Sequence, residues 1–203
     1  MGTKTLLIGG GFVVAAVLLW RKFNDAEKDA KQSDKQTENI SDTITQQAVK
    51  LYNIISPTKV LGGWTVQIDT YPPSRVVSIY NVLCEVYDWA KVQDKFRALT
   101  GGDLTLLQAF NLCLDSEQLN KALTIAAAAK IKTTAEAVVT LRDNTSEYGI
   151  VTKTFPANTI IGYKTSGGSL STSFVNGYKR ENWYSTNIVE ITGTIDTKKI
   201  QII

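Results

Sequence analysis

The first hydrophobic positions of the chain form one block at residues 5–20, which contains no charged side chain and lies between Lys4 and Arg21–Lys22. As a helix this block is about 24 Å long, slightly less than the ~30 Å hydrocarbon core of a bilayer, and the flanking basic side chains can reach the interface from both ends. The sequence therefore predicts a single-pass transmembrane anchor over residues 1–22. The residues expected in the bilayer or at its interface are Leu6, Leu7, Ile8, Phe12, Val13, Val14, Val17, Leu18, Leu19 and Trp20.

A cleaved signal peptide and a buried helix are the alternative interpretations of this block. A signal peptide ends in a small-x-small cleavage site, whereas Ala15–Ala16 is followed here by Val-Leu-Leu-Trp-Arg-Lys. The anchor is therefore the favoured interpretation. Basic residues on its two sides nearly balance, so the sequence leaves the orientation across the membrane open.

After the anchor, residues 23–39 are mostly polar and contain neither Gly nor Pro, which indicates a stalk that is either a helix or a flexible tether. Helical spacing then marks residues 40–132 as a small helical domain. In its first expected helix, apolar side chains recur at helical intervals and Ser56–Pro57 ends the pattern. These apolar positions are Ile44, Ala48, Leu51 and Ile55.

Three further helices are expected in the helical domain. Residues 60–71 form a loop or short strand, and a long helix then runs from Ser74 to Leu99, where Gly101–Gly102 ends it. Asp103 is expected to cap the next helix, to about residue 112. Asp115 or Ser116 is expected to cap one more through residue 129.

Short β-branched segments replace the helical pattern from residue 134 onwards. Strands are expected at residues 137–141, 150–155, 159–164 and 187–192, separated by turn residues. Residues 134–203 therefore predict a small β-barrel or sandwich, and the complete chain an α+β fold. The side chains expected inside this β-rich module are Ile160, Ile161 and Val189.

Composition narrows the chemistry available to the chain. It contains no His, so neither a Ser-His-Asp nor a Cys-His site can form within it, and His-containing zinc sites are excluded too. The net charge of +3 comes from interspersed acids and bases without a polybasic tract, and this predicts no nucleic-acid partner. Cys84 and Cys113 lie in apolar stretches, which favours buried core positions over a disulfide.

Carboxylates are the remaining candidates for acid–base catalysis. Glu85, Asp88, Asp94 and Asp103 lie close together in the sequence, but helix capping and solvated helix faces explain them better than a catalytic pair. No phosphate-binding loop of the GxxxxGK[ST] type is present. The sequence therefore predicts no catalytic residue, no cofactor and no metal.

Two segments resemble known folds. Asp88–Trp89, Val92, Phe96 and Asp103–Leu104 follow a DW-x2-V-x3-F…G-x-DL pattern, which resembles helix-turn-helix segments of Bacteroidetes and their phages and is loosely annexin-like. The calcium-binding K-G-x-G-T of annexins is missing, so calcium binding does not transfer. Residues 149–183 are loosely similar to SH3-like barrels through Phe155-Pro-Ala-Asn-Thr-Ile-Ile-Gly162 and Asn182-Trp183-Tyr184.

These features and resemblances lead to the expectation of a non-enzymatic, membrane-anchored structural protein of a lipid-containing Bacteroidetes or Flavobacterium phage, where it would link the virion membrane to the capsid. Its expected partners are the bilayer, capsid or envelope proteins and other copies of itself. Trp183 and Tyr184 are the candidate interface aromatics. One alternative is a bacterial inner-membrane protein whose β-rich module binds peptidoglycan or an envelope partner; another is a lytic accessory enzyme using Glu85 or a neighbour.

Overall fold

The computed structural model describes residues 42–66, 72–143, 150–182 and 185–203, and within them residues 44–203 form one compact α+β unit. The expected anchor and stalk lie outside the described residues, as do Trp183 and Tyr184. Among the described helices, none combines the length and the apolar character needed to cross a bilayer.

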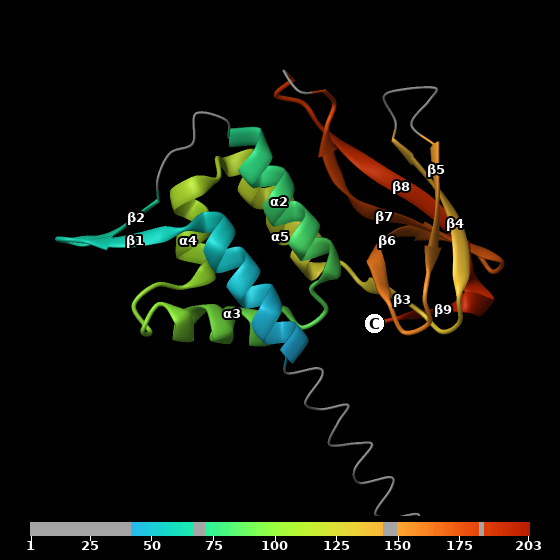
Figure 1. The fold of residues 1–203 in the computed structure, drawn as a ribbon, viewed down its shortest axis with the longest axis horizontal. Helices are drawn as coiled ribbons and strands as arrows, with labels where there is room; N and C mark the ends of the chain where they lie inside the picture. Colours follow the sequence, from blue (N-terminus) through green and yellow to red (C-terminus); the bar gives the residue numbers. More distant parts are fainter. Residues whose placement is uncertain (1–41, 67–71, 144–149, 183–184) are drawn as a thin grey trace, which may run out of the picture. The chain divides into compact units, whose positions relative to one another are not determined.

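The helical part is built from a helix at residues 42–55, a β-hairpin and four further helices (Figure 1). Inside the helix at residues 42–55, the four positions expected to be apolar and buried, Ile44, Ala48, Leu51 and Ile55, are at most 2% exposed, which confirms the helical spacing. The remaining elements are β1 (Pro57–Val60), β2 (Gly63–Val66), α2 (Pro72–Glu85), α3 (Trp89–Leu99), α4 (Leu106–Cys113) and α5 (Ser116–Ala127).

The single long helix expected from residue 74 to residue 99 is wrong, because the chain breaks between α2 and α3. Asp88 takes a non-helical conformation there and its side chain accepts a hydrogen bond from the backbone N–H of Lys91, so it begins a new helix. The expected glycine end of this region is confirmed. Gly101 has φ +69°, and Gly101 and Gly102 donate to the carbonyls of Ala98 and Arg97 in a Schellman motif.

Of the caps expected for α4 and α5, the first is wrong and the second is confirmed. Asp103 does not cap α4: Thr105 does, in a capping box with Gln108, and the Asp103 carboxylate instead pairs with Lys59 of β1. Asp115 caps α5 as expected, with Gln118 completing a second capping box.

The β-rich part is one antiparallel sheet of seven strands, so the expected barrel or sandwich is corrected. In the order β5-β4-β8-β7-β6-β3-β9, the edge strands β5 and β9 do not pair with each other, and a barrel requires that closing pair. The strands are β3 (Lys130–Thr133), β4 (Ala137–Asp143), β5 (Ile150–Phe155), β6 (Ile160–Gly167), β7 (Ser171–Arg180), β8 (Ile188–Asp196) and β9 (Ile200–Ile202), with a 3-10 turn η1 (Thr197–Lys199) before β9.

The sheet curls around a hydrophobic core of its own (Figure 1). Register shifts in the pairings of β3 with β6, β6 with β7 and β7 with β8 allow this bending. Gly162 brings β6 close to β7, since a Cβ at its φ of +135° would lie 2.0 Å from the carbonyl oxygen of Val175. The core side chains are Ile131, Ala137, Val139, Leu141, Phe155, Ile161, Phe174 and Ile195.

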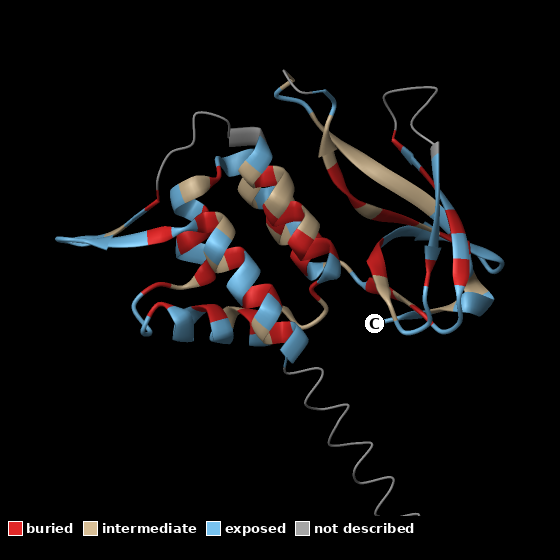
Figure 2. Cartoon of the chain, viewed as in Figure 1, coloured by how far each residue is buried: buried red, intermediate tan, exposed pale blue. Residues whose placement is uncertain are grey.

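The opposite face of β6 and β7 packs against α2, so the helical part and the sheet share a second core. Figure 2 shows the buried positions of α2 and β7 in red. Tyr163, Val175 and Tyr178 belong to this core. Of the three side chains expected inside the β-rich module, Ile161 is buried, whereas Ile160 and Val189 are only half-buried.

Candidate functional site

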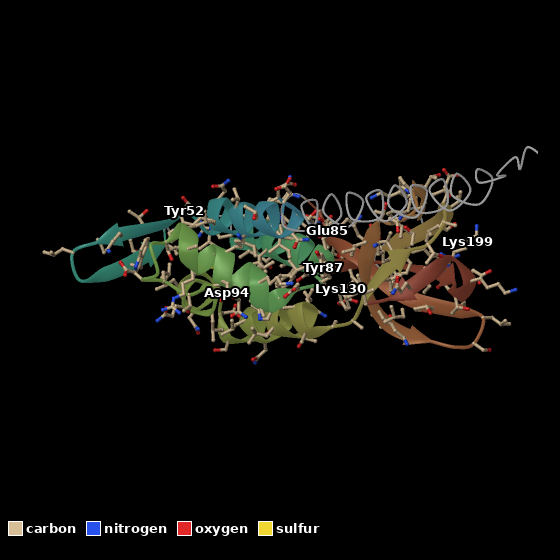
Figure 3. All side chains as sticks on the ribbon, turned by 90° about the horizontal axis from the view of Figure 1, so that it is seen from below. Tyr52, Glu85, Tyr87, Asp94, Lys130 and Lys199 are labelled. Atoms are coloured by element: carbon tan, nitrogen blue, oxygen red, sulfur yellow. The ribbon has the colours of Figure 1, made fainter. Side chains whose placement is uncertain are left out.

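The carboxylates that the sequence groups together do not converge in the structure. Glu85 ends α2 and is exposed, while Asp94 is an exposed residue within α3, and Figure 3 shows the two apart. Lys91 holds Asp88 by an ion pair of 2.8 Å, and this hydrogen bond lowers the pKa of the Asp88 carboxyl. Lys59 likewise lowers the pKa of Asp103. Each of these two carboxylates thus has its own lysine partner, and neither shares a proton with another acid.

A partly buried polar cluster lies instead between the helices and the sheet. The hydroxyls of Tyr163 on β6 and Tyr178 on β7 are 2.6 Å apart, and the Tyr178 hydroxyl donates to Oε1 of Glu190 at 3.3 Å. Lys121 of α5 reaches the same carboxylate oxygen at 2.6 Å, and its ammonium lies 5.7 Å from the Tyr178 ring. The cluster therefore joins α5 to three adjacent strands.

Lys130, at the start of β3, extends this cluster into the core. Its side chain is 1% exposed, and its ammonium donates to the carbonyls of Ile125 and Ala128 at the end of α5. The C-terminal carbonyls of a helix favour a cation, and the Tyr163 ring lies 5.7 Å from the same ammonium. Burial lowers the pKa of Lys130 to about 8 and raises that of the neighbouring Cys84 thiol to about 12.

These groups are more suited to holding the layers together than to chemistry on a ligand. Burial raises the pKa of Tyr163 to about 12, and burial together with the Tyr163 hydrogen bond raises that of Tyr178 further, so both phenols stay protonated as hydrogen-bond donors. Cys84 and Cys113 are free, and burial also raises the pKa of Cys113, to about 11. Neither thiol has the lowered pKa of a reactive cysteine.

A side-chain amide adds a second connection between α2 and the sheet. Asn81 donates from Nδ2 to the carbonyl of Tyr178 at 3.0 Å and accepts the Tyr178 backbone N–H at 2.6 Å. Gly177 makes this approach feasible, because a Cβ there would lie 2.8 Å from the Asn81 oxygen. The amide thus pairs with the β7 backbone as a neighbouring strand would.

Within the residues that the structure describes, the most exposed apolar feature is the β1–β2 hairpin, which projects from the helical part (Figure 1). At its turn, Leu61 is 106% exposed and Val60 is 48% exposed. Behind the turn, Trp64 of β2 is half-buried, and the paired Lys59 lies 5.9 Å from its ring. The loop or short strand expected at residues 60–71 thus includes the turn and second strand of a hairpin, in which Val60-Leu61 precedes Gly62-Gly63.

A hollow of about 330 Å³ opens beside this hairpin. Its apolar lining comes from Trp64, Leu104 and Leu112, and its polar lining from Asp103 and the amides of Gln108 and Asn111. Leu107 and Leu112 on α4 are 42% and 41% exposed. The hairpin and α4 therefore present an apolar surface bordered by two amides and by the Asp103 carboxylate, which is paired with Lys59, and this suits binding better than catalysis.

Within the described residues, no three acidic or cysteine side chains group as metal ligands do. No family model, curated protein or solved structure matches the chain. The candidate site is therefore defined by its geometry alone: an interaction surface at the hairpin and α4.

Proposed function

We propose that this chain is a membrane-anchored structural protein that links a bilayer to a protein shell, in a lipid-containing virion of the Bacteroidetes-phage type. The observation that carries the proposal is the uncharged run at residues 5–20, bounded by Lys4 and by Arg21–Lys22. A run of this kind between basic residues is typical of a membrane-spanning helix.

In the described part, polar contacts between the helices and the sheet support a linking role. Asn81 hydrogen-bonds α2 to β7, and Lys121 and Lys130 connect α5 with the sheet by polar contacts. Because these contacts supplement a shared apolar core, residues 44–203 should move as one body. A body of this kind can keep a fixed spacing between an anchor and a partner surface.

Placing a charge inside the apolar run tests the membrane part of the proposal. Val13→Arg should cost about 2.5–3.5 kcal/mol on insertion scales, because a charged side chain at the centre of a spanning helix is poorly solvated. Thr3→Arg, which adds the same charge beside Lys4, is the matched control. The measurement is the fraction of full-length protein that floats with liposomes; equal flotation of Val13→Arg and wild type would reject the anchor.

Fractionation tests the shell part of the proposal. Mild detergent extraction of membrane-containing particles should release lipid while leaving this protein attached to the protein shell. Recovery with the lipid fraction alone would contradict a link. Specific sedimentation with purified cell-wall sacculi would instead support the envelope-protein alternative.

A further inference from the structure

The seven-stranded sheet has two edges, and only one of them is formed by a strand of ordinary length. Among the described strands, β5 pairs only with β4, and β9 pairs only with β3, so one side of each lacks a neighbouring strand. The backbone N–H and C=O groups of such an edge can pair with a strand of another chain. A very short edge strand limits this pairing, and β9 has three residues, whereas β5 has six.

The sequence of β5 suits pairing with another chain at every position except one. From residue 150 to 155 the strand reads Ile-Val-Thr-Lys-Thr-Phe, and all of its residues other than Lys153 are β-branched or aromatic. Six-residue segments of high β-propensity and low charge, without Pro, are the ones that stack between chains. Val151 on β5 and Val138 on β4 add exposed apolar surface, at 61% and 63% exposure. Lys153 is therefore the one charge in a strand that is otherwise prone to association.

Lys153 lies on the face of β5 that packs into the sheet core further along the strand. It is paired with Val139 of β4, which is buried in that core. Phe155, two residues further on, points to the same face and is buried there too. Lys153 itself is exposed, and its ammonium lies 4.8 Å from the centre of the Phe155 ring. An inward-pointing charge on an edge strand is one of the devices by which sheets avoid edge-to-edge pairing.

Two copies that joined antiparallel at this edge would bring their Lys153 side chains together. With a two-fold axis at residue 153 the two lysines lie directly opposite each other, and with the axis at residue 152 or 154 they are diagonal neighbours. Opposite side chains have Cβ atoms about 5 Å apart and diagonal ones about 7–8 Å, and like charges in such positions disfavour pairing. No carboxylate of the described residues forms an ion pair with Lys153 that would offset its charge.

We propose that Lys153 keeps the β5 edge unpaired, because its charge prevents a second copy of this chain from adding its own β5 to the sheet. The protected surface is the free side of β5, and the excluded partner is the same strand of another copy. This protection is independent of the anchor and of the shell partner.

Disulfide cross-linking across the edge tests the proposal. Full-length proteins that carry Thr152→Cys or Thr154→Cys are mixed in detergent micelles and oxidised, once with Lys153 retained and once with Lys153→Val in both. Disulfides between these two positions cover the three registers, and the native thiols, which are buried or half-buried, set the background. Because the substitution removes a cross-strand repulsion, we expect the disulfide-linked dimer to increase roughly fivefold with Lys153→Val.

Three further variants separate the charge from other effects of the substitution. Lys153→Glu removes the contact with the Phe155 ring but keeps the edge charged, so it should cross-link no more than the protein with Lys153. Lys164→Val removes an exposed lysine from β6, which has β3 and β7 on its two sides, and it should also leave cross-linking unchanged. Lys153→Gln, which removes the charge without adding apolar surface, replaces Lys153→Val if circular dichroism shows a changed fold.

Analytical ultracentrifugation of the same variants without the added cysteines should give the same ranking of association. Equal cross-linking with Lys153 and with the uncharged variants would overturn the proposal. Cross-linking of Lys153→Glu as strong as that of Lys153→Val would assign the effect to the lost ring contact instead of the charge. An equal increase with Lys164→Val would show a general loss of solubility, and either result would also overturn the proposal.

Discussion

Replacing Asn81 by alanine removes both hydrogen bonds between the α2 side chain and the β7 backbone. In the wild type, Asn81 Nδ2 donates to the Tyr178 carbonyl at 3.0 Å, and Asn81 Oδ1 accepts the Tyr178 N–H at 2.6 Å. The substitution leaves a backbone donor and a backbone acceptor without these partners at a part-buried position. A new partner for them can only be water that enters between helix and sheet.

The expected loss follows from the number of groups left unpaired. A buried polar group without a partner costs about 1–3 kcal/mol. Two such groups, partly reachable by water, give an expected loss of about 2–4 kcal/mol in the free energy of unfolding. Asn111→Ala is the matched control, because that exposed amide donates only to the Leu107 carbonyl within its own helix; its effect should stay within about 0.5 kcal/mol.

Urea-induced unfolding of the detergent-solubilised protein, followed by circular dichroism, measures both variants. Asn81→Asp refines the test: the ionised carboxylate can accept the Tyr178 N–H but cannot donate, whereas the protonated acid can do both. The difference in the free energy of unfolding between Asn81→Asp and wild type should therefore become smaller at acidic pH. A loss below about 0.5 kcal/mol for Asn81→Ala would refute the reasoning, as would helices and strands that unfold in separate transitions in the wild type.

Two further predictions concern pH and helix capping. Because burial lowers the pKa of Lys130 to about 8 in the folded protein, the unfolded chain holds the Lys130 proton more tightly between pH 8 and the usual value of 10.5, and the Lys130 contribution to stability should rise with pH in this window. Burial raises the pKa of Cys84 and Cys113, so these thiols act in the opposite direction, and the Lys130 contribution is read as the difference between wild type and Lys130→Met. Between pH 8 and 9.5, Lys130 should add about 1.5 kcal/mol to the free energy of unfolding. The Lys130→Met protein should lack this increase. Parallel pH profiles of the free energy of unfolding for the two proteins would contradict a buried ammonium. Thr105→Ala should lower stability by about 1 kcal/mol in the same assay, since it removes the α4 cap, whereas Asp103→Ala should behave nearly as wild type. If Asp103→Ala instead lost more stability than Thr105→Ala, Asp103 would be the cap.

The helical part follows from the sequence where one local signal determines the outcome. Apolar spacing correctly placed the helix at residues 42–55, and Gly101–Gly102 correctly marked the end of α3. The break at residues 86–88 was missed because the apolar spacing continues across it, and only the cap at Asp88 shows where the new helix begins. Thr105 and Asp103 are both good capping residues, and the ion pair with Lys59 that occupies Asp103 is a contact between distant residues.

The sheet was only half predictable because several of its strands lack an apolar pattern. The β4 and β5 strands alternate or are β-branched, and their positions were expected. In contrast, β3 reads Lys-Ile-Lys-Thr and contains a lysine whose burial depends on carbonyls of α5, while β7 is rich in Ser, Asn and Gly. Whether β5 and β9 meet is a matter of long-range pairing, which short sequence patterns do not encode.

The candidate site was mostly missed at the level of sequence. Leu61 could have been identified, since an apolar residue beside two glycines is unusual for a turn. The hollow could not, because it combines Trp64 of β2 with Leu104 and with residues of α4, which only tertiary packing brings together. The cluster of Tyr163, Tyr178 and Glu190 likewise joins three strands whose order is not apparent from their spacing.

The position of β3 in the sheet has a consequence for the order of folding. This strand lies between β6 and β9, and the backbone of Lys130 exchanges two hydrogen bonds with Ile203, at 2.7 and 2.9 Å. Contacts this far apart in sequence form slowly, whereas the helices rely on near neighbours. As the chain leaves the ribosome, the helices can therefore fold while one side of β3 still lacks its partner. Until β9 arrives, the open edge of this strand can pair with another chain, which exposes a nascent chain to aggregation and makes it a substrate for a chaperone.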